Sequence, residues 1–191
     1  MNLEPLDLST LNNRTIVIVS SQDVSLFLQD ILAQINVQQG IVTSNQPVYS
    51  AFAFATESVR LHLEFQPEAH RSDDPMFAVF DKCFVDNSWM HDRSIQRYFH
   101  ANRSFQKTAI FVLPQIKGLF PGLRADIDVL CIGTLPQDEA KRIYDWFFQT
   151  TISFPIFVQL LDTYTKDGGF LVLRLDCPSE AANPVKYHPT G

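Results

Sequence analysis

Three segments of the chain place polar residues directly after an apolar stretch, and chemistry is expected first at these positions. Residues 20–25 follow the first stretch, Asp81 follows the second and Gln115 follows the third. Because ligands of open parallel sheets bind at the carboxyl ends of the strands, all three are candidate site positions. Asp81 in such a place is able to hold magnesium through water. In a nucleotide-hydrolysing site the next position often carries a second acid that polarises the attacking water, but here that position is Lys82. The alternative is that Asp81 caps or positions the loop that follows the strand.

Residues 20–25 precede a helical pattern but lack the sequence that cradles nucleotide phosphates. That sequence, GxxxxGK[ST], uses glycines to let backbone N–H groups wrap the phosphates and a lysine to neutralise them. Aligned on the helix start, Asp23 replaces the second glycine, Val24 replaces the lysine, and Ser25 takes the place of the hydroxyl that would hold magnesium. The loop is also shorter. A carboxylate in a phosphate cradle is repulsive, and this loop carries no lysine to offset it.

A local basic stretch lies in the middle of the chain, at Arg93, Arg97, His100, Arg103 and Lys107. These side chains are candidates for contact with DNA or with an acidic partner, and a solvated helix face is the alternative. The whole chain carries 15 Lys and Arg against 21 Asp and Glu, a net charge of −6. This balance argues against nonspecific coating of DNA, so any contact must come from a local patch.

Other classes of site find no support in the residue spacing. Cys83, Cys131 and Cys177 are far apart and lie in or beside apolar segments, so we expect buried, reduced thiols. The five histidines have no metal-ligand spacing, and no metal site is expected. No Gly-x-Ser-x-Gly or catalytic Cys–His arrangement occurs either.

The apolar patterns predict an α/β fold with a mostly parallel sheet flanked by helices. The four core strands, expected to be neighbours, are 15–19, 77–80, 108–113 and 129–132. A helix over 24–35 follows the first strand, with Asp23 or Ser21 as its N-cap. Further strands are expected at 48–54, 59–65 and 170–175, and further helices at 92–100, after Pro136 and from Ser153.

The length of 191 residues predicts one domain. A short polar leader is expected at 1–13, before the first strand. The segment after the last strand is expected to be loosely held. No apolar run approaches the roughly 20 residues that a membrane helix needs, and residues 1–10 do not resemble a signal peptide. We therefore expect an intracellular protein without a membrane span.

Four blocks in order resemble the genome-packaging ATPases of large DNA viruses, the poxvirus-type relatives of the HerA–FtsK translocases among the P-loop NTPases. The blocks are the strand, loop and helix at 15–35, VFDKC at 79–83, residues 102–133, and residues 164–176. Within them Asn102-Arg103-Ser104 is similar to the family's basic turn, Gln115 to its polar sensor, and residues 123–128 to its arginine-containing segment. The resemblance extends over about residues 14–188 and implies a RecA-like P-loop NTPase fold.

The same resemblance assigns a role to Arg124. An arginine in this segment would reach a neighbouring subunit's phosphates as an arginine finger does. The alternative is an ion pair within the chain, near Asp126 or Asp128.

Because the fold-bearing blocks are kept and the phosphate-binding residues are lost, the resemblance implies a degenerate ATPase. Such a protein would be a structural or regulatory component of viral genome packaging or virion assembly, in the virion or at a cytoplasmic assembly site, without a cofactor. Its expected partners are further copies of itself or an active packaging ATPase, with capsid protein and viral DNA as further candidates.

Two alternatives remain open. In the first, the chain is an active ATPase that uses ATP and magnesium, with Asp81 on the metal, Arg124 acting in trans, and the missing lysine supplied by Lys82 or Lys117. In the second, it is a non-catalytic interaction module outside this family that binds through a surface rich in phenylalanine.

Overall fold

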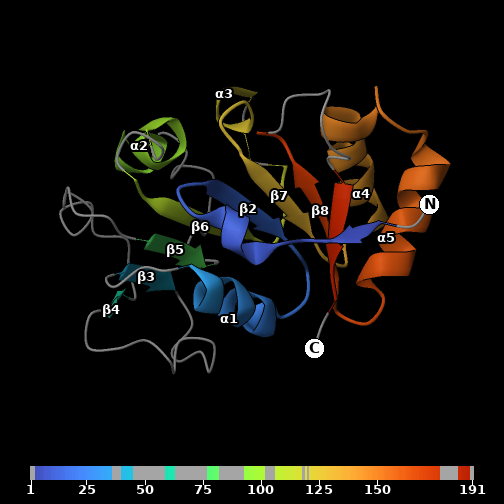
Figure 1. The fold of residues 1–191 in the computed structure, drawn as a ribbon. Coiled ribbons are helices and arrows are strands. Elements are labelled where there is room, and N and C mark those ends of the chain that lie inside the picture. The colour runs from blue at the N-terminus through green and yellow to red at the C-terminus, as the bar shows by residue number, and fades with distance from the viewer. Residues whose placement is uncertain are drawn as a thin grey trace.

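The computed structural model describes residues 3–35, 40–44, 59–62, 77–81, 93–101, 106–117, 119, 121–176 and 185–189, with backbone only for 59–62, 94, 97, 100 and 101. Within these residues nine strands form one sheet in the order β1-β9-β8-β7-β2-β6-β5-β3-β4 (Figure 1). The strands are β1 (Glu4–Pro5), β2 (Thr15–Val19), β3 (Gly40–Ser44), β4 (Val59–His62), β5 (Phe77–Asp81), β6 (Thr108–Leu113), β7 (Val129–Ile132), β8 (Phe170–Arg174) and β9 (Val185–His188). The helices are η1 (Leu8–Leu11), α1 (Ser25–Gln34), α2 (Arg93–Ala101), α3 (Pro121–Arg124), α4 (Gln137–Ile143), η5 (Tyr144–Phe148) and α5 (Phe154–Thr165).

The four predicted core strands are neighbours, as expected. β7, β2, β6 and β5 lie side by side in that order and are parallel, with Val19 aligned to both Leu113 and Ile132. Only β8 among the described strands runs antiparallel to its neighbours. The predicted fold class, a mostly parallel sheet flanked by helices, is confirmed. The carboxyl ends of β2, β5, β6 and β7 therefore share one edge of the sheet, here called the carboxyl edge.

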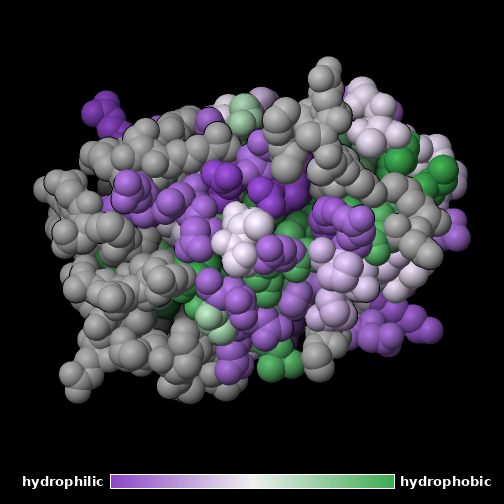
Figure 2. All heavy atoms as spheres, viewed as in Figure 1, coloured by the Kyte–Doolittle hydropathy of each residue, from purple (hydrophilic) through white to green (hydrophobic). Residues whose placement is uncertain are grey.

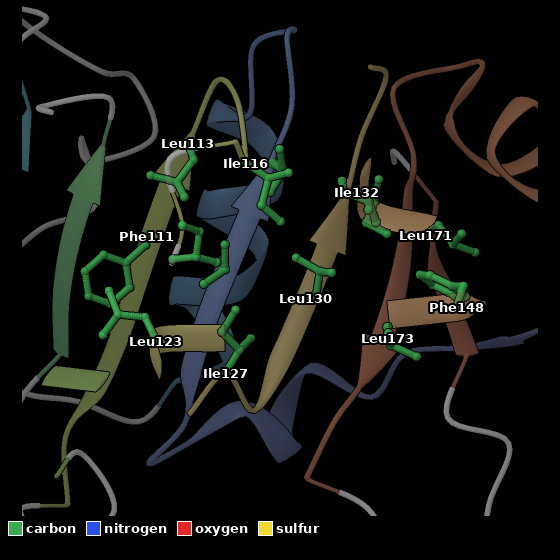
Figure 3. Packing of buried hydrophobic residues seen from close by; sticks show 14 of the residues in the cluster. Phe111, Leu113, Ile116, Leu123, Ile127, Leu130, Ile132, Phe148, Leu171 and Leu173 are labelled. Carbon is green, nitrogen blue, oxygen red and sulfur yellow. The ribbon is translucent and has the colours of Figure 1, made fainter. Parts of the chain in front are cut away.

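Helices cover both faces of the sheet, which explains why the core strands are apolar at successive positions. On one face, Ile16 and Ile18 pack with α1 residues that include Phe27. On the other face, Val17 and Val19 belong to a cluster that includes side chains from α2, α3, α4 and α5. Figure 1 shows α1 on the opposite side of the sheet from α2 and α3, and Figure 3 shows part of the second cluster.

Both chain ends described by the structure belong to the sheet. β1 lies within the segment predicted to be a leader, and Leu3, Leu6 and Leu11 of that segment are buried. β1 pairs with β9, which lies in the segment predicted to be loosely held. For residues 185–188 the expectation of a loosely held segment is wrong, because β9 is also paired with β8. Residues 177–184 lie outside the described part of the chain.

Other elements differ in part from their predictions. β3 was not predicted, since its sequence GIVTS is short and half polar. β4 covers the first half of the expected strand at 59–65, whereas the expected strand at 48–54 lies outside the described residues. The single helix predicted after Pro136 is α4 followed by the π-helical turn η5.

No helix among the described residues is long and apolar enough to cross a membrane. Figure 2 shows that the described part of this face of the molecule is mostly hydrophilic, with only small hydrophobic areas.

Candidate functional site

The loop after β2, residues 20–25, is held between the ends of two neighbouring strands by its own backbone. The Ser20 N–H donates to the Leu113 carbonyl at the end of β6, at 3.2 Å. The Ser21 N–H and hydroxyl both donate to the carbonyl of Thr134, just after β7, at 3.0 and 2.8 Å. The Gln22 N–H donates to the Ser20 hydroxyl at 3.1 Å. Three N–H groups of this loop are therefore already paired within the protein.

The carboxylate of Asp23 accepts hydrogen bonds at the start of α1. Its Oδ1 accepts hydrogen bonds from the Ser25 N–H at 3.0 Å and from the Ser25 hydroxyl at 2.6 Å. The N-cap residue of α1 is Val24, so the predicted N-cap at Asp23 or Ser21 is wrong. The carboxylate thus lies where the helix start would attract an anion, and it engages the hydroxyl that the motif comparison assigns to magnesium.

Val24, at the position of the missing lysine, points into the protein. Its side chain is 3% exposed and belongs to the hydrophobic cluster between α1 and the sheet. Its carbonyl accepts the Leu28 N–H of α1. The lysine position is thus part of the core.

Gly133 permits the close approach that closes the loop. A Cβ at this position would lie 2.6 Å from the Ser20 hydroxyl oxygen and 2.9 Å from the Ser20 Cβ. The Gly133 N–H also donates to the Val19 carbonyl at 2.9 Å. Ser20 and Ser21 lie in the predicted segment 20–25, but Gly133 and Thr134 were not predicted as site residues, because their contacts with that segment join residues more than a hundred positions apart.

Asp81 is the last residue of β5 and is buried, with 1% exposure. The hydroxyl of Ser44, the last residue of β3, donates to its Oδ2 at 3.1 Å. Asp81 aligns with Val112 of β6, so it lies along the carboxyl edge together with the 20–25 loop and Gln115. The three predicted positions therefore lie at the carboxyl ends of neighbouring parallel strands. Lys82 lies outside the described residues.

Gln115 follows β6 in a short loop, residues 114–117, whose backbone is held by α4. Gln115 and Lys117 are exposed, whereas Ile116 is fully buried. The Ile116 N–H donates to Oε2 of Glu139 at 2.7 Å. Glu139 was missed by sequence reasoning, since an acidic residue in the first turn of a helix is common and its partner lies 23 residues away.

Arg124 lies apart from the other candidates. Its Nε donates to the Leu119 carbonyl at 2.8 Å, and its guanidinium lies 3.4 Å from the centre of the Trp146 ring. Burial lowers the pKa of this guanidinium. Figure 3 shows Leu123, the preceding residue, toward the amino ends of the strands, and Leu113 toward their carboxyl ends. The segment after Arg124 leads to Asp128, whose N–H donates to the Thr15 carbonyl at the amino end of β2, whereas the 20–25 loop follows the carboxyl end of β2.

The basic stretch is only partly described. Arg93 is exposed at the start of α2, and the backbone of Arg97 lies in the same helix. Lys107 is 5% exposed and offers little surface to DNA or a partner. Arg103 lies outside the described residues.

No cluster of metal-ligating side chains occurs in the described ranges. Cys131 is a buried free thiol, as predicted, and burial raises its pKa. Cys83 and Cys177 lie outside the described part of the chain.

Comparison with solved structures shows which proteins share this fold. The DNA-packaging ATPase B204 of Sulfolobus turreted icosahedral virus is 15% identical, with a TM-score of 0.60 over 94% of this chain and 98% of that chain. The genome-packaging NTPase B204 of Sulfolobus turreted icosahedral virus 2, in complex with ATP-gammaS, is 15% identical, with a TM-score of 0.59 over 93% and 97% of the two chains. The pCW3 conjugation coupling protein TcpA is 10% identical, with a TM-score of 0.54 over 96% of this chain and 61% of that one.

No protein-family model and no curated protein matches the sequence. At these identities the likeness concerns the fold. The chain shares the fold of these viral packaging and conjugation proteins.

Proposed function

We propose that this chain is a packaging-ATPase-like protein that does not hydrolyse nucleotide and instead works by association in viral genome packaging or virion assembly. It would be a degenerate relative of the poxvirus-type packaging ATPases, and its partners would be further copies of itself or an active packaging ATPase. The fold shared with B204 supports the packaging context. The hydrogen bonding of the 20–25 loop supports the loss of catalysis.

The observation that carries this proposal is that four backbone N–H groups of the loop donate hydrogen bonds within the protein. A phosphate cradle needs free backbone N–H groups that converge on an anion. Here the N–H groups of Ser20, Ser21, Gln22 and Ser25 all donate to protein oxygens. A phosphate would have to break these bonds and displace the Asp23 carboxylate, whose charge opposes it. The closed loop therefore favours a protein without nucleotide chemistry.

ATP with magnesium is accordingly expected to bind with a dissociation constant no better than about 1 mM, equivalent to about 4 kcal/mol. Isothermal titration calorimetry measures this directly. The B204 NTPase, whose structure in complex with ATP-gammaS is known, serves as the positive control under the same conditions. A micromolar constant for this chain would show that the loop opens for nucleotide and would favour the active-ATPase alternative.

Replacing Arg124 with alanine is expected to weaken self-association or binding to an active packaging ATPase by about 2 kcal/mol or more. Arginine stacked on a half-buried tryptophan is typical of residues that dominate binding at protein interfaces. Sedimentation velocity and pull-down would measure the loss, with Lys166→Ala as the control because Lys166 is an exposed cation at the end of α5 and is not a candidate contact residue. A wild-type chain that stays monomeric and binds neither partner would contradict the proposal.

A further inference from the structure

We propose that Glu139 is a positioning residue that fixes the loop at 114–117 and so presents Gln115 at the carboxyl edge. The assignment of Gln115 to contact with a partner rests on the proposed function, in which the chain works by association. The fixing of the loop itself follows from contacts within the chain.

The contact is short, buried and long-range. Glu139 is 3% exposed, and its Oε2 accepts the Ile116 N–H at 2.7 Å. Hydrogen bonds with an ionised partner are shorter and stronger than neutral ones, and this distance lies in their range. Without the carboxylate, the backbone N–H of a fully buried residue would lose this partner, which is costly.

The surroundings of Glu139 compensate its charge. Nη1 of Arg142 donates to Oε1 at 2.7 Å, so each carboxylate oxygen has one donor. Glu139 also lies in the first turn of α4, where the helix dipole favours a negative charge. Asp138 lies in the same turn and is exposed. Asp138 already provides a favourable acid for the helix start, so the burial of Glu139 is better explained by its bond to the loop.

The consequence for Gln115 follows from its two neighbours. Pro114 restricts the backbone through its ring, and Ile116 is anchored by its burial in the core and by Glu139. Figure 3 shows Ile116 near Leu113 at the carboxyl ends of the strands. The exposed Gln115 is thus held on a short rigid frame beside the 20–25 loop, to which the Leu113 carbonyl is bonded. A side chain held this way loses little conformational entropy on binding.

The first test measures the loop directly. In the wild type, the backbone order parameter of Gln115 by ¹⁵N relaxation is expected to be about 0.85, and in Glu139→Ala below about 0.6. The Ile116 amide is expected to exchange with solvent at least tenfold faster in Glu139→Ala. Asp138→Ala is the matched control, since it removes the same charge type from the same helical turn, and neither quantity should change. Glu139→Gln keeps an acceptor oxygen and should largely restore the Gln115 order parameter and the Ile116 exchange rate. This variant also allows the test if Glu139→Ala fails to fold.

The second test is a double-mutant cycle on association, measured by sedimentation. Gln115→Ala and Glu139→Ala should each weaken association, and the double variant should be no more than about twofold weaker than Gln115→Ala alone, because one residue acts through the other. Additive losses would overturn the proposal. So would unchanged Gln115 dynamics and Ile116 exchange in both Glu139 variants. If the wild type does not associate at all, the proposed function fails, but the amide measurements still decide the role of Glu139.

Discussion

Replacing Val24 with lysine is expected to lower the free energy of unfolding by about 3 kcal/mol or more, since an uncompensated charge in the interior costs about 3–5 kcal/mol. Lysine is the residue that a phosphate-binding loop carries at this position, yet here the side chain lies in the core between α1 and the sheet. Leu26→Lys is the matched control, two residues further along and 63% exposed, and it should change stability by less than about 0.5 kcal/mol. Urea denaturation of both variants measures the difference.

The functional consequence is that restoring the motif residues alone should not restore binding. Asp23→Gly combined with Val24→Lys removes the opposing carboxylate, but three N–H groups of the loop remain bonded to Leu113, Thr134 and Ser20. Calorimetry with ATP and magnesium should therefore still give a constant no better than about 1 mM. If Val24→Lys is as stable as Leu26→Lys, or if the double variant binds ATP in the micromolar range, then position 24 is open to the loop and the argument against nucleotide binding is wrong.

Truncating Leu11 to alanine is expected to destabilise the fold by about 2–5 kcal/mol, the range for a leucine removed from a packed core. Leu11 is fully buried in the cluster on the α1 face, although it lies in the segment predicted to be a leader. The same segment contributes Leu6 to this cluster and Leu3 to the cluster on the opposite face. The segment therefore contributes side chains to the hydrophobic clusters on both faces of the sheet.

Removal of residues 1–11 should have a larger effect than Leu11→Ala, because β1 and three buried leucines are lost together. Circular dichroism with urea denaturation would measure both changes. Glu4→Ala is the control, since Glu4 is exposed and contacts Lys186 at the surface, and it should cost less than about 1 kcal/mol. A truncated protein with unchanged stability would show that residues 1–11 do not contribute to the stability of the fold.

The amino-acid sequence alone was sufficient to predict the central sheet. A strand covered by helices on both faces needs apolar side chains at successive positions, and the runs at Thr15–Val19, Thr108–Leu113 and Val129–Ile132 satisfy this locally. The bounds of these three strands agree with their predictions. The substitutions at Asp23 and Val24 were equally visible, because a motif compares residue types at fixed spacing.

Strands β1 and β9, at one side of the sheet, could not be predicted in this way. β1 contains only Glu4 and Pro5, and its neighbour β9 contains four residues, so neither has a strong strand pattern of its own. β1 forms because its backbone pairs with β9, which pairs with β8 in turn. The register of β1 is therefore decided by its pairing with residues more than a hundred positions away.

The candidate site also combines features that the sequence predicts with features that only the tertiary structure reveals. The sequence determined which phosphate-binding residues are missing and that Asp81 and Gln115 follow strands of one parallel sheet. Only the tertiary structure decided that Val24 lies in the core, that the Ser21 N–H is bonded to Thr134, and that Glu139 holds the loop beside Gln115. It also separated Gln115 from Arg124, because the chain returns along the sheet from the carboxyl end of β6 to the amino end of β7. Spacing along the chain does not reveal such contacts, since they depend on which strands and helices become neighbours when the sheet assembles.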